Sequence, residues 1–368
     1  MKLAIIGAVL GQEMLCHKAR EMQIETIGFA WEKGATCKHL FDKFYPISIY
    51  DTDKIIDICK KERIDGVVSN ASEKTVDVVA TVTDALGLRG GPLSTTKKIK
   101  DKTYTRQISN SVEGFTPIPF YKYDGRKNDI YPCVIKPCTA AAKRGVSFVH
   151  DEQEFEKALA YAQAESKNGV TIEAYIEGAE VSVESISFDG KHYVIQITDK
   201  DNSGAPHFVE LGHHQPSALP ENIQKKIRTA VPKLLDAVKF QNGATHIELK
   251  IGKHGEIYLI EINPRGGGDG ISNILVERST NCDYVKKMIE VALGIFTPPD
   301  VHNTGYAGVY FLCKQTCEYV EKFKAVNSQT WLLSKDVKTY EVSEATGNQD
   351  RNGYFIYSAD HKITMNEI

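Results

Sequence analysis

The 368-residue sequence lacks the features that mark exported and membrane proteins. No continuous apolar run reaches the roughly 18 residues that a membrane helix needs. The start, MKLAIIGAVLGQEM, has no long apolar core and no small-residue cleavage site of a signal peptide. The 8 cysteines include no CxxC pair, so we expect reduced core thiols rather than a disulfide framework or a zinc site. These absences favour a soluble protein of the cytoplasm.

A large excess of charge of one sign is also missing. The formal net charge is −3, which argues against a broad surface for nucleic acid or for an anionic membrane. We therefore expect neither as a partner. The hydrophobic fraction of 42 % is ordinary for a globular protein, and the length indicates two or three domains. The sequence shows no internal repeat and no low-complexity segment.

The first ninety residues alternate between strand-like and helical patterns. Apolar runs that favour strands are followed by segments with helical spacing, which is typical of a doubly wound parallel sheet. The strands are expected at residues 2–7, 24–30 and 65–70, and the helices at residues 12–22, 51–64 and 73–86.

A dinucleotide-binding fingerprint is incomplete in this region. The turn after the first strand reads GAVLG, with Gly7 and Gly11 but without the middle glycine of G-x-G-x-x-G. That glycine lets the pyrophosphate approach the backbone. A nicotinamide-dependent oxidoreductase is thus a weak alternative, and a structural or substrate-contacting domain is the better interpretation.

From residue 94 onward the pattern changes. A basic helical stretch precedes a strand that ends in Lys136 and Pro137, and a helix follows at 151–166. Strands at 170–176, 180–188 and 191–198 then predict an antiparallel meander. A helix is expected at 220–240, kinked or divided at Pro232. We expect domains at residues 1–93, 94–190, 191–300 and 301–368, the last a small appendage.

Two acidic strands stand out at residues 245–263, THIELKIGKHGEIYLIEIN. A two-residue turn at His254 and Gly255 pairs them, with Ile251 opposite Tyr258 and Glu248 opposite Glu261. The apolar face of this hairpin is predicted to hold Ile247, Leu249, Ile251, Tyr258, Ile260 and Ile262. The polar face is predicted to hold His246, Glu248, Lys250, Glu261 and Asn263.

Facing carboxylates about 5 Å apart at Cβ destabilise a sheet because their charges repel. A divalent cation between them makes the arrangement favourable, and Mg²⁺ prefers such oxygen ligands. Glu248, Glu261 and the Asn263 amide are thus candidate magnesium ligands. The alternative is a solvated polar face on which Lys250 and Lys253 neutralise the acids.

A magnesium site with three protein ligands needs further oxygens, and phosphates are the usual source. Basic residues upstream of the hairpin can hold phosphates: Lys102, Lys136, Lys143 and Arg144. Lys136 is the best of them, since it ends an apolar strand before a proline and should point into a cleft.

In this order, these segments resemble the ATP-grasp superfamily. They are Lys102, the Lys136-Pro137 strand with its small-residue loop, IEAYIEGAEVSVES, Glu248, and EINPR. The resemblance covers residues 1–298 and is strongest to the carboxylate–amine ligases that join amino acids to other acids or amines. It implies an α/β protein with an N-terminal doubly wound parallel-sheet domain, then a two-lobed α+β ATP-grasp domain with antiparallel sheets and a small C-terminal appendage.

The resemblance also implies roles for single residues. Lys102, Lys136 and Lys143 would hold nucleotide phosphates, Glu173 and the backbone near Ile176 the adenine, and Glu180 the ribose. Glu248, Glu261 and Asn263 would bind magnesium. Arg265 would stabilise the acyl-phosphate or the tetrahedral intermediate. Gly267 and Gly268 would present backbone amides to the substrate, and Glu210 and His213 would contact the acceptor.

The sequence departs from the family in the phosphate loop. Family loops carry serines and glycines, whereas this chain has three alanines and Lys143, whose charge could replace the backbone amides. Two further alternatives concern nearby residues. Zinc binding by His207, His213 and His214 lacks a suitably spaced further ligand, and Cys138 is better explained as a buried apolar residue than as a reactive thiol.

The predicted function is therefore an ATP- and Mg²⁺-dependent ligase that activates a small carboxylic or amino acid as an acyl-phosphate and joins it to an amine. Its partners would be the small-molecule carboxylate and amine, and a homodimer is the commonest assembly for such a protein. The alternative is an ATP-binding module or a kinase-like relative without ligation, which the altered phosphate loop would suit.

Overall fold

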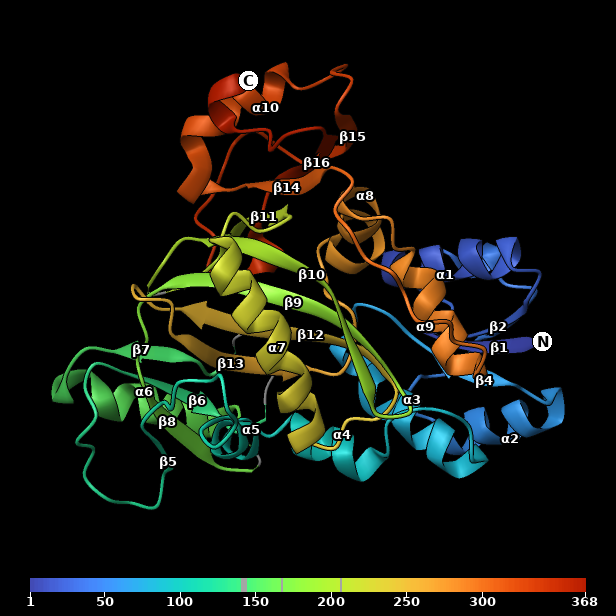
Figure 1. Cartoon of the computed structure of the whole chain (residues 1–368), viewed down its shortest axis with the longest axis horizontal. Coiled ribbons are helices and arrows are strands. Elements are labelled where there is room, and N and C mark those ends of the chain that lie inside the picture. Colours follow the sequence, from blue (N-terminus) through green and yellow to red (C-terminus); the bar gives the residue numbers. More distant parts are fainter. Residues whose placement is uncertain (140–143, 167, 206) are drawn as a thin grey trace.

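The computed structural model describes residues 1–139, 144–166, 168–205 and 207–368. In these residues the longer strands form three sheets, two with 4 strands and one with 8 (Figure 1). The strands are β1 (Lys2–Ile6), β2 (Glu25–Phe29), β3 (Lys43–Tyr45), β4 (Gly66–Val68), β5 (Phe120–Lys122), β6 (Cys133–Pro137), β7 (Ser147–Val149), β8 (Val170–Ala174), β9 (Ala179–Phe188), β10 (Lys191–Asn202), β11 (Glu210–Gln215), β12 (Gly243–Ile251), β13 (Ile257–Asn263), β14 (Tyr306–Leu312), β15 (Leu332–Val337) and β16 (Gly353–Ala359). The α-helices are α1 (Leu10–Glu21), α2 (Thr52–Glu62), α3 (Glu73–Leu86), α4 (Leu93–Ile99), α5 (Lys102–Ser109), α6 (Glu152–Ala164), α7 (Glu221–Ala237), α8 (Val276–Ser279), α9 (Tyr284–Leu293) and α10 (Val320–Ala325).

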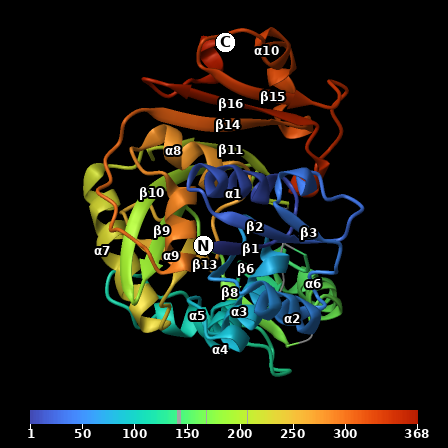
Figure 2. The ribbon, with the colours of Figure 1, turned by 90° about the vertical axis from the view of Figure 1, so that its right-hand side faces the viewer.

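The N-terminal sheet is parallel, with strand order β3-β2-β1-β4, and helices cover both of its faces (Figure 2). Leu3 and Ile5 pack with α1 and α9 on one face, and Ala4 and Ile6 pack with α2 and α3 on the other. Strands buried on both faces read as continuous apolar runs, as β1 does. The predicted doubly wound domain is confirmed, although α9 comes from far later in the chain.

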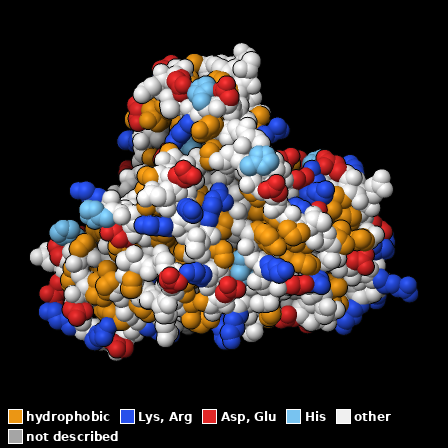
Figure 3. All heavy atoms as spheres, in the orientation of Figure 1, with side chains coloured by type: hydrophobic (Ala, Val, Ile, Leu, Met, Phe, Trp, Pro, Cys, Tyr) orange, Lys and Arg blue, Asp and Glu red, His pale blue; other side chains and the backbone are white. Residues whose placement is uncertain are grey.

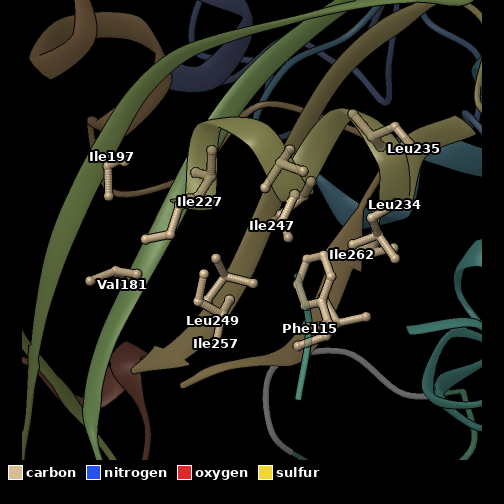
Figure 4. Close-up of a cluster of buried hydrophobic side chains, with 14 of the residues drawn as sticks. Phe115, Val181, Ile197, Ile227, Leu234, Leu235, Ile247, Leu249, Ile257 and Ile262 are labelled. Atoms are coloured by element: carbon tan, nitrogen blue, oxygen red, sulfur yellow. The ribbon is translucent and has the colours of Figure 1, made fainter. Parts of the chain in front are cut away.

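The large sheet is antiparallel, with order β13-β12-β9-β10-β11-β14-β16-β15. Helix α7 packs on one face of it and contributes Ile227, Leu234 and Leu235 to a buried apolar cluster with Val181 and Ile247 (Figure 4). Pro232 was predicted to kink or divide this helix. It does not divide it, because the helix continues through the proline from Glu221 to Ala237. Burial of its apolar face stabilises the helix against the loss of one backbone hydrogen bond.

The small sheet has order β5-β8-β6-β7, and α6 packs against it. The prediction of one meander over residues 170–198 is therefore wrong for its first strand. Strand β8 pairs with β5 and β6, whereas β9 pairs with β10 and β12. Val170 and Ile172 pack in the core under α6, so burial assigns β8 to the small sheet.

The β12–β13 hairpin follows the predicted register only at its far end. Glu248 pairs with Glu261 as predicted, but a bulge shifts the register, so Ile251 pairs with Ile257 instead of Tyr258. Buried Leu259 takes the place on the core face that was predicted for Ile260, which instead lines a cleft. A bulge re-aims side chains in this way, and register cannot be carried through it by counting.

The C-terminal region extends the large sheet, because β14 pairs with β11 and β16 pairs with both β14 and β15. Figure 1 shows this region, in orange and red, next to β11, so that β15 is one edge of the large sheet. The four-domain division stays a prediction. Its boundary at residue 190 falls in the turn between the paired strands β9 and β10.

The composition-based expectations can be compared with the surface and the core. Among the described residues, every helix is too short or too polar to cross a bilayer. All the cysteines are free, and Cys317 is the exposed one while the others are buried. Acidic and basic side chains are intermixed over the face shown in Figure 3, in line with the small net charge.

Candidate functional site

A cleft of about 460 Å³ lies between the small sheet and the large sheet, within the usual size of a ligand pocket. Most of the residues predicted for the site line it. They are Lys102, Lys136, Glu173, Ile176, Glu180, Glu210, His213, Glu248, Glu261, Asn263, Arg265 and Gly268. Lys143 lies outside the described residues, and Gly267 sits behind the lining.

The three predicted metal ligands meet on one face of the hairpin. Glu248 and Glu261 are direct partners across the ladder, and His246 pairs with Asn263. The alternative of a solvated face with Lys250 and Lys253 as counter-ions does not describe this arrangement, since Lys253 is exposed and the Lys250 ammonium donates to the Ile176 carbonyl at 3.0 Å. Two carboxylates and a buried amide are hard oxygen donors, so the residues fit a Mg²⁺ ion.

Two other lysines supply positive charge to these carboxylates. Lys102 donates to Glu261 at 2.9 Å, and Lys200 donates to Glu248 at 2.8 Å. Burial alone would lower the pKa of Lys200, but Glu210, Glu248 and Glu180 outweigh it and raise that pKa well above its ordinary value. Burial likewise works against ionisation of Glu248, yet Lys200 and His246 hold its pKa well below the usual range. The Glu248 carboxylate is therefore held in its charged form, which is the form that binds a cation.

Lys136 is held at the cleft by a buried ion-pair cluster. Its ammonium and the Arg106 guanidinium both lie 2.8 Å from the same oxygen of Glu173. Burial lowers the pKa of Lys136 and Glu173 offsets part of that effect, while the two cations keep the pKa of Glu173 low despite its burial. Glu173, which the resemblance assigned to adenine, thus contacts Lys136 directly. The backbone near Ile176 lines the cleft where the adenine was predicted.

The glycine run after β13 has two different environments. A Cβ on Gly267 would lie 2.7 Å from the His246 ring and 2.9 Å from Glu184, so this position has room only for glycine. Its amide donates to Glu184 at 2.9 Å. A Cβ on Gly268 would meet no described atom within 4 Å, and Gly268 faces the cleft. The Gly267 amide is therefore taken up by Glu184, and Gly268 is the one of the two that lines the cleft.

Glu184 and His246 both pack against Gly267 of the glycine run. The His246 ring bonds to Glu184 and lies 3.3 Å from Glu248. Burial would lower the pKa of His246, but these carboxylates outweigh it and raise the pKa to about 9. A protonated imidazole therefore joins the metal-side carboxylate to the glycine loop.

Arg265 points across the cleft toward the N-terminal domain. Its Nε lies 3.5 Å from Glu73, whose other oxygen is 3.1 Å from Lys100. Glu73 begins α3, which follows the carboxyl end of β4, and ligands of parallel sheets bind at such ends. The N-terminal domain thus contributes a carboxylate to the site.

The other end of the cleft contains Glu210, His213 and Asp269. The His213 Nε2 lies 3.2 Å from Glu210 and 3.6 Å from Asp269. Burial would lower the pKa of His213, but the two carboxylates outweigh it and raise the pKa above its ordinary value. Glu180, predicted for the ribose, accepts from Asn202 at 2.9 Å and lies 3.6 Å from Lys200.

The remaining histidines and Cys138 do not form the alternative sites. His214 bonds to Tyr357 and Asp201, and among the described residues no metal-binding cluster contains it or His207. Cys138 is fully buried, and burial raises the pKa of its thiol, so it is an unreactive core residue.

Several residues that line the cleft or contact its lining were missed by sequence reasoning. They are Glu73, Arg106, Glu184, Lys200, Asp269, Asn348 and Arg351. Lys200 had a signal, since a lysine within a long strand is costly to bury without partners. Asp269 directly follows the glycine run, but Arg106, Asn348 and Arg351 lie in unremarkable sequence.

Comparison with known proteins agrees with this geometry. Residues 130–273 match the profile of the ATP-grasp domain family, a region that includes β6, β8, the β12–β13 hairpin and the glycine run after it. Residues 130–273 are an ATP-grasp domain. The predicted fold class and family are confirmed.

Individual relatives are distant in sequence. The chain is 27 % identical over 271 residues to alanine–anticapsin ligase of Bacillus amyloliquefaciens, a match covering 63 % of this chain and 57 % of that relative. It is also 22 % identical over 366 residues to the formate-dependent phosphoribosylglycinamide formyltransferase of Sulfolobus acidocaldarius, covering 94 % of this chain and 89 % of that protein.

Solved structures share the fold over nearly the whole chain. The L-amino acid ligase from Bacillus licheniformis superposes with a TM-score of 0.81 at 22 % identity, covering 98 % of this chain and 93 % of that one. N5-carboxyaminoimidazole synthetase from Staphylococcus aureus, complexed with ADP, gives a TM-score of 0.75 at 14 % identity and covers 100 % and 94 %. The chain therefore shares its fold with both of these structures over nearly its whole length.

Proposed function

We propose that this protein is an ATP-dependent carboxylate–amine ligase. It activates a small carboxylic or amino acid as an acyl-phosphate and joins it to an amine, with release of ADP and phosphate. The observation that carries the proposal is the pair Glu248 and Glu261, which face each other in a cleft that also holds Lys102 and Lys136. The named activities of the ligase relatives support it.

The chain's own residues bind and neutralise charge in this reaction. The substrate carboxylate attacks the terminal phosphorus of ATP, and the amine then displaces phosphate from the acyl-phosphate. Lys102 and Lys136 bind the phosphates, and both are buried, so their attraction for an anion is weakly screened. Glu248, Glu261 and Asn263 would hold Mg²⁺, which supplies charge neutralisation at the phosphates.

Arg265 and Gly268 act at the reacting carbonyl. The Arg265 guanidinium stabilises negative charge that develops there, and Glu73 holds it in place from across the cleft. The Gly268 backbone is open to the substrate. Because these groups are already in place before the reaction, they need little reorganisation as charge develops, which lowers the activation barrier.

A phosphate-release assay tests the proposal. Pairs of the standard amino acids are supplied with ATP and Mg²⁺ to the wild type and to Glu261→Gln and Arg265→Ala. At least one pair should stimulate release, and each variant should lose about 100-fold or more of that rate. Glu256→Gln, at the turn of the same hairpin, is the matched control and should keep it.

Two outcomes would contradict ligation. If the folded wild type binds ATP but no pair stimulates ADP release, it is a binding module. If mass spectrometry finds a phosphorylated acid without a joined product, the protein is a kinase-like relative.

A further inference from the structure

A segment of the C-terminal region forms part of the cleft. Thr346, Gly347, Asn348 and Gln349 line it, although they lie well over a hundred residues after β11 in the chain. We call residues 346–351 the acceptor wall. The wall lies at the end of the cleft that contains Glu210, His213 and Asp269.

Internal hydrogen bonds hold the acceptor wall in a compact turn. The Asp350 carboxylate accepts from the Thr346 amide and hydroxyl, both at 2.9 Å, and from the Gly347 amide at 3.0 Å. These charge-assisted bonds fix the backbone of the wall without contacting the cleft. The wall is therefore an ordered turn that forms one side of the cleft.

Two side chains of the wall contact the cleft carboxylates. Both terminal nitrogens of Arg351 donate to Asp269, at 2.9 and 2.8 Å, and its guanidinium stacks 3.6 Å above the Phe311 ring. Asn348 donates to the Glu210 carboxylate at 3.1 Å and accepts from the Glu210 amide at 3.1 Å. A bidentate guanidinium and a two-point amide contact both hold their partners in a defined orientation.

His213 gives an independent indication that this end binds a ligand. The residue has 0 % exposure; its Nε2 faces Glu210 and Asp269, and its Nδ1 has no hydrogen-bond partner in the described part of the chain. Buried polar atoms are rarely left unsatisfied, so a group from a ligand is expected there. The ring lies at the cleft surface beside Glu210 and Asp269.

We propose that the acceptor wall determines which amine the cleft accepts, and that Arg351 is the positioning residue that holds Asp269 for this purpose. This inference rests on the proposed function. Glu210 and Asp269 are acceptors for an ammonium group, and the position of Asp269 depends on the bidentate grip of Arg351. Within the described part of the chain, no hydrogen bond or ion pair joins the wall to Glu248 or Glu261, so nucleotide binding should not depend on it.

Steady-state kinetics of Arg351→Gln and Arg351→Lys test the inference with the amino-acid pair that wild type uses best. Arg351→Gln should raise the KM of the amine by about tenfold or more and leave the KM of ATP within about twofold. Arg351→Lys keeps the charge but not the two-pronged hydrogen bond, so its KM for the amine should lie between the values of wild type and Arg351→Gln. Lys338→Gln removes a positive charge from an exposed site of the same region and should behave as wild type.

An equal change in both KM values, or none in either, would overturn the role of the wall. A second measurement does not require turnover: hydrogen exchange of the peptide covering the wall, with a non-hydrolysable ATP analogue and Mg²⁺. Addition of the standard amino acids should slow its exchange beyond the analogue alone. If the exchange rate of the wall peptide is unchanged, the wall does not bind the amine. If amino acids slow its exchange but the wild type releases no phosphate, the protein has an amine site at the wall but is not a ligase.

Discussion

The two ends of the cleft are built in different ways. At the proposed metal end, Glu248, Glu261 and Asn263 come from one hairpin, and their spacing in the sequence predicts that they meet. At the acceptor end, Glu210, Asp269 and Arg351 come from three segments that are far apart in the chain. Local periodicity can reveal the first kind of site, whereas the second depends on how the large sheet is completed by its C-terminal strands.

Lys200 connects the two ends. Its ammonium lies 2.8 Å from Glu248, 3.0 Å from Glu210 and 3.6 Å from Glu180. One cation thus neutralises a metal-side acid, an acceptor-side acid and the acid predicted for the ribose. The ends differ in origin but share a buried electrostatic centre.

The largest expected effect is a loss of stability in Glu173→Gln, at the proposed nucleotide end of the cleft. This change leaves Arg106 and Lys136 buried without their shared carboxylate, so we expect a loss of about 3–5 kcal/mol in unfolding free energy. Denaturant unfolding measures it. Glu165→Gln is the control, because Glu165 lies 3.7 Å from the exposed Arg144 and outside the cluster. Equal stability of the two variants would show that the cluster does not hold Lys136.

A smaller effect is expected where the N-terminal domain meets the glycine loop. Glu73→Gln should lower kcat about tenfold with little change in ATP binding, because Arg265 loses the carboxylate that orients it. Asp77→Asn is the matched control, since Asp77 shares Lys100 with Glu73 but does not contact Arg265. A rise in the KM of ATP instead of a fall in kcat would show that Arg265 acts on the nucleotide rather than on the reacting carbonyl.

The smallest effect is a pH dependence at the acceptor end. The pKa of His213 is raised in the folded protein, so its protonated form adds stability below about pH 6.5, its ordinary value, and this contribution is lost as pH rises through the raised pKa. His213→Gln should therefore destabilise more at pH 6 than at pH 9, by less than about 2 kcal/mol. His254→Gln, in the exposed hairpin turn, should show no such difference. Thermal unfolding at both pH values measures it, and equal losses would contradict a protonated His213.

Much of the fold follows from sequence patterns. The doubly wound N-terminal domain, α3 and the pairing of Glu248 with Glu261 all depend on local periodicity, which sequence shows directly. The register beyond Glu248 was wrong because a bulge adds a residue to one strand without changing its composition. The sheet assignment of β8 was wrong because turn signals do not say which strand pairs with which.

The site shows the same limit. The adenine role of Glu173 stays a prediction, and its contacts with Arg106 and Lys136 could not be predicted because they join distant parts of the chain. Arg351 could not be found, because its role depends on Asp269 and on the pairing of β14 with β11 and β16. Contacts between distant segments are set by tertiary packing, and spacing along the chain carries no record of them.

The central claim is that Glu248 and Glu261 share a divalent cation that also binds the nucleotide phosphates. A crystal structure with Mn²⁺ and a non-hydrolysable ATP analogue tests it most directly, through the anomalous signal of the metal. We predict a peak between the two carboxylates, within ligand distance of both and of phosphate oxygens, about 2.0–2.3 Å. A peak at Glu210, His213 and Asp269 alone, or a bound nucleotide with no metal at the hairpin, would contradict the claim.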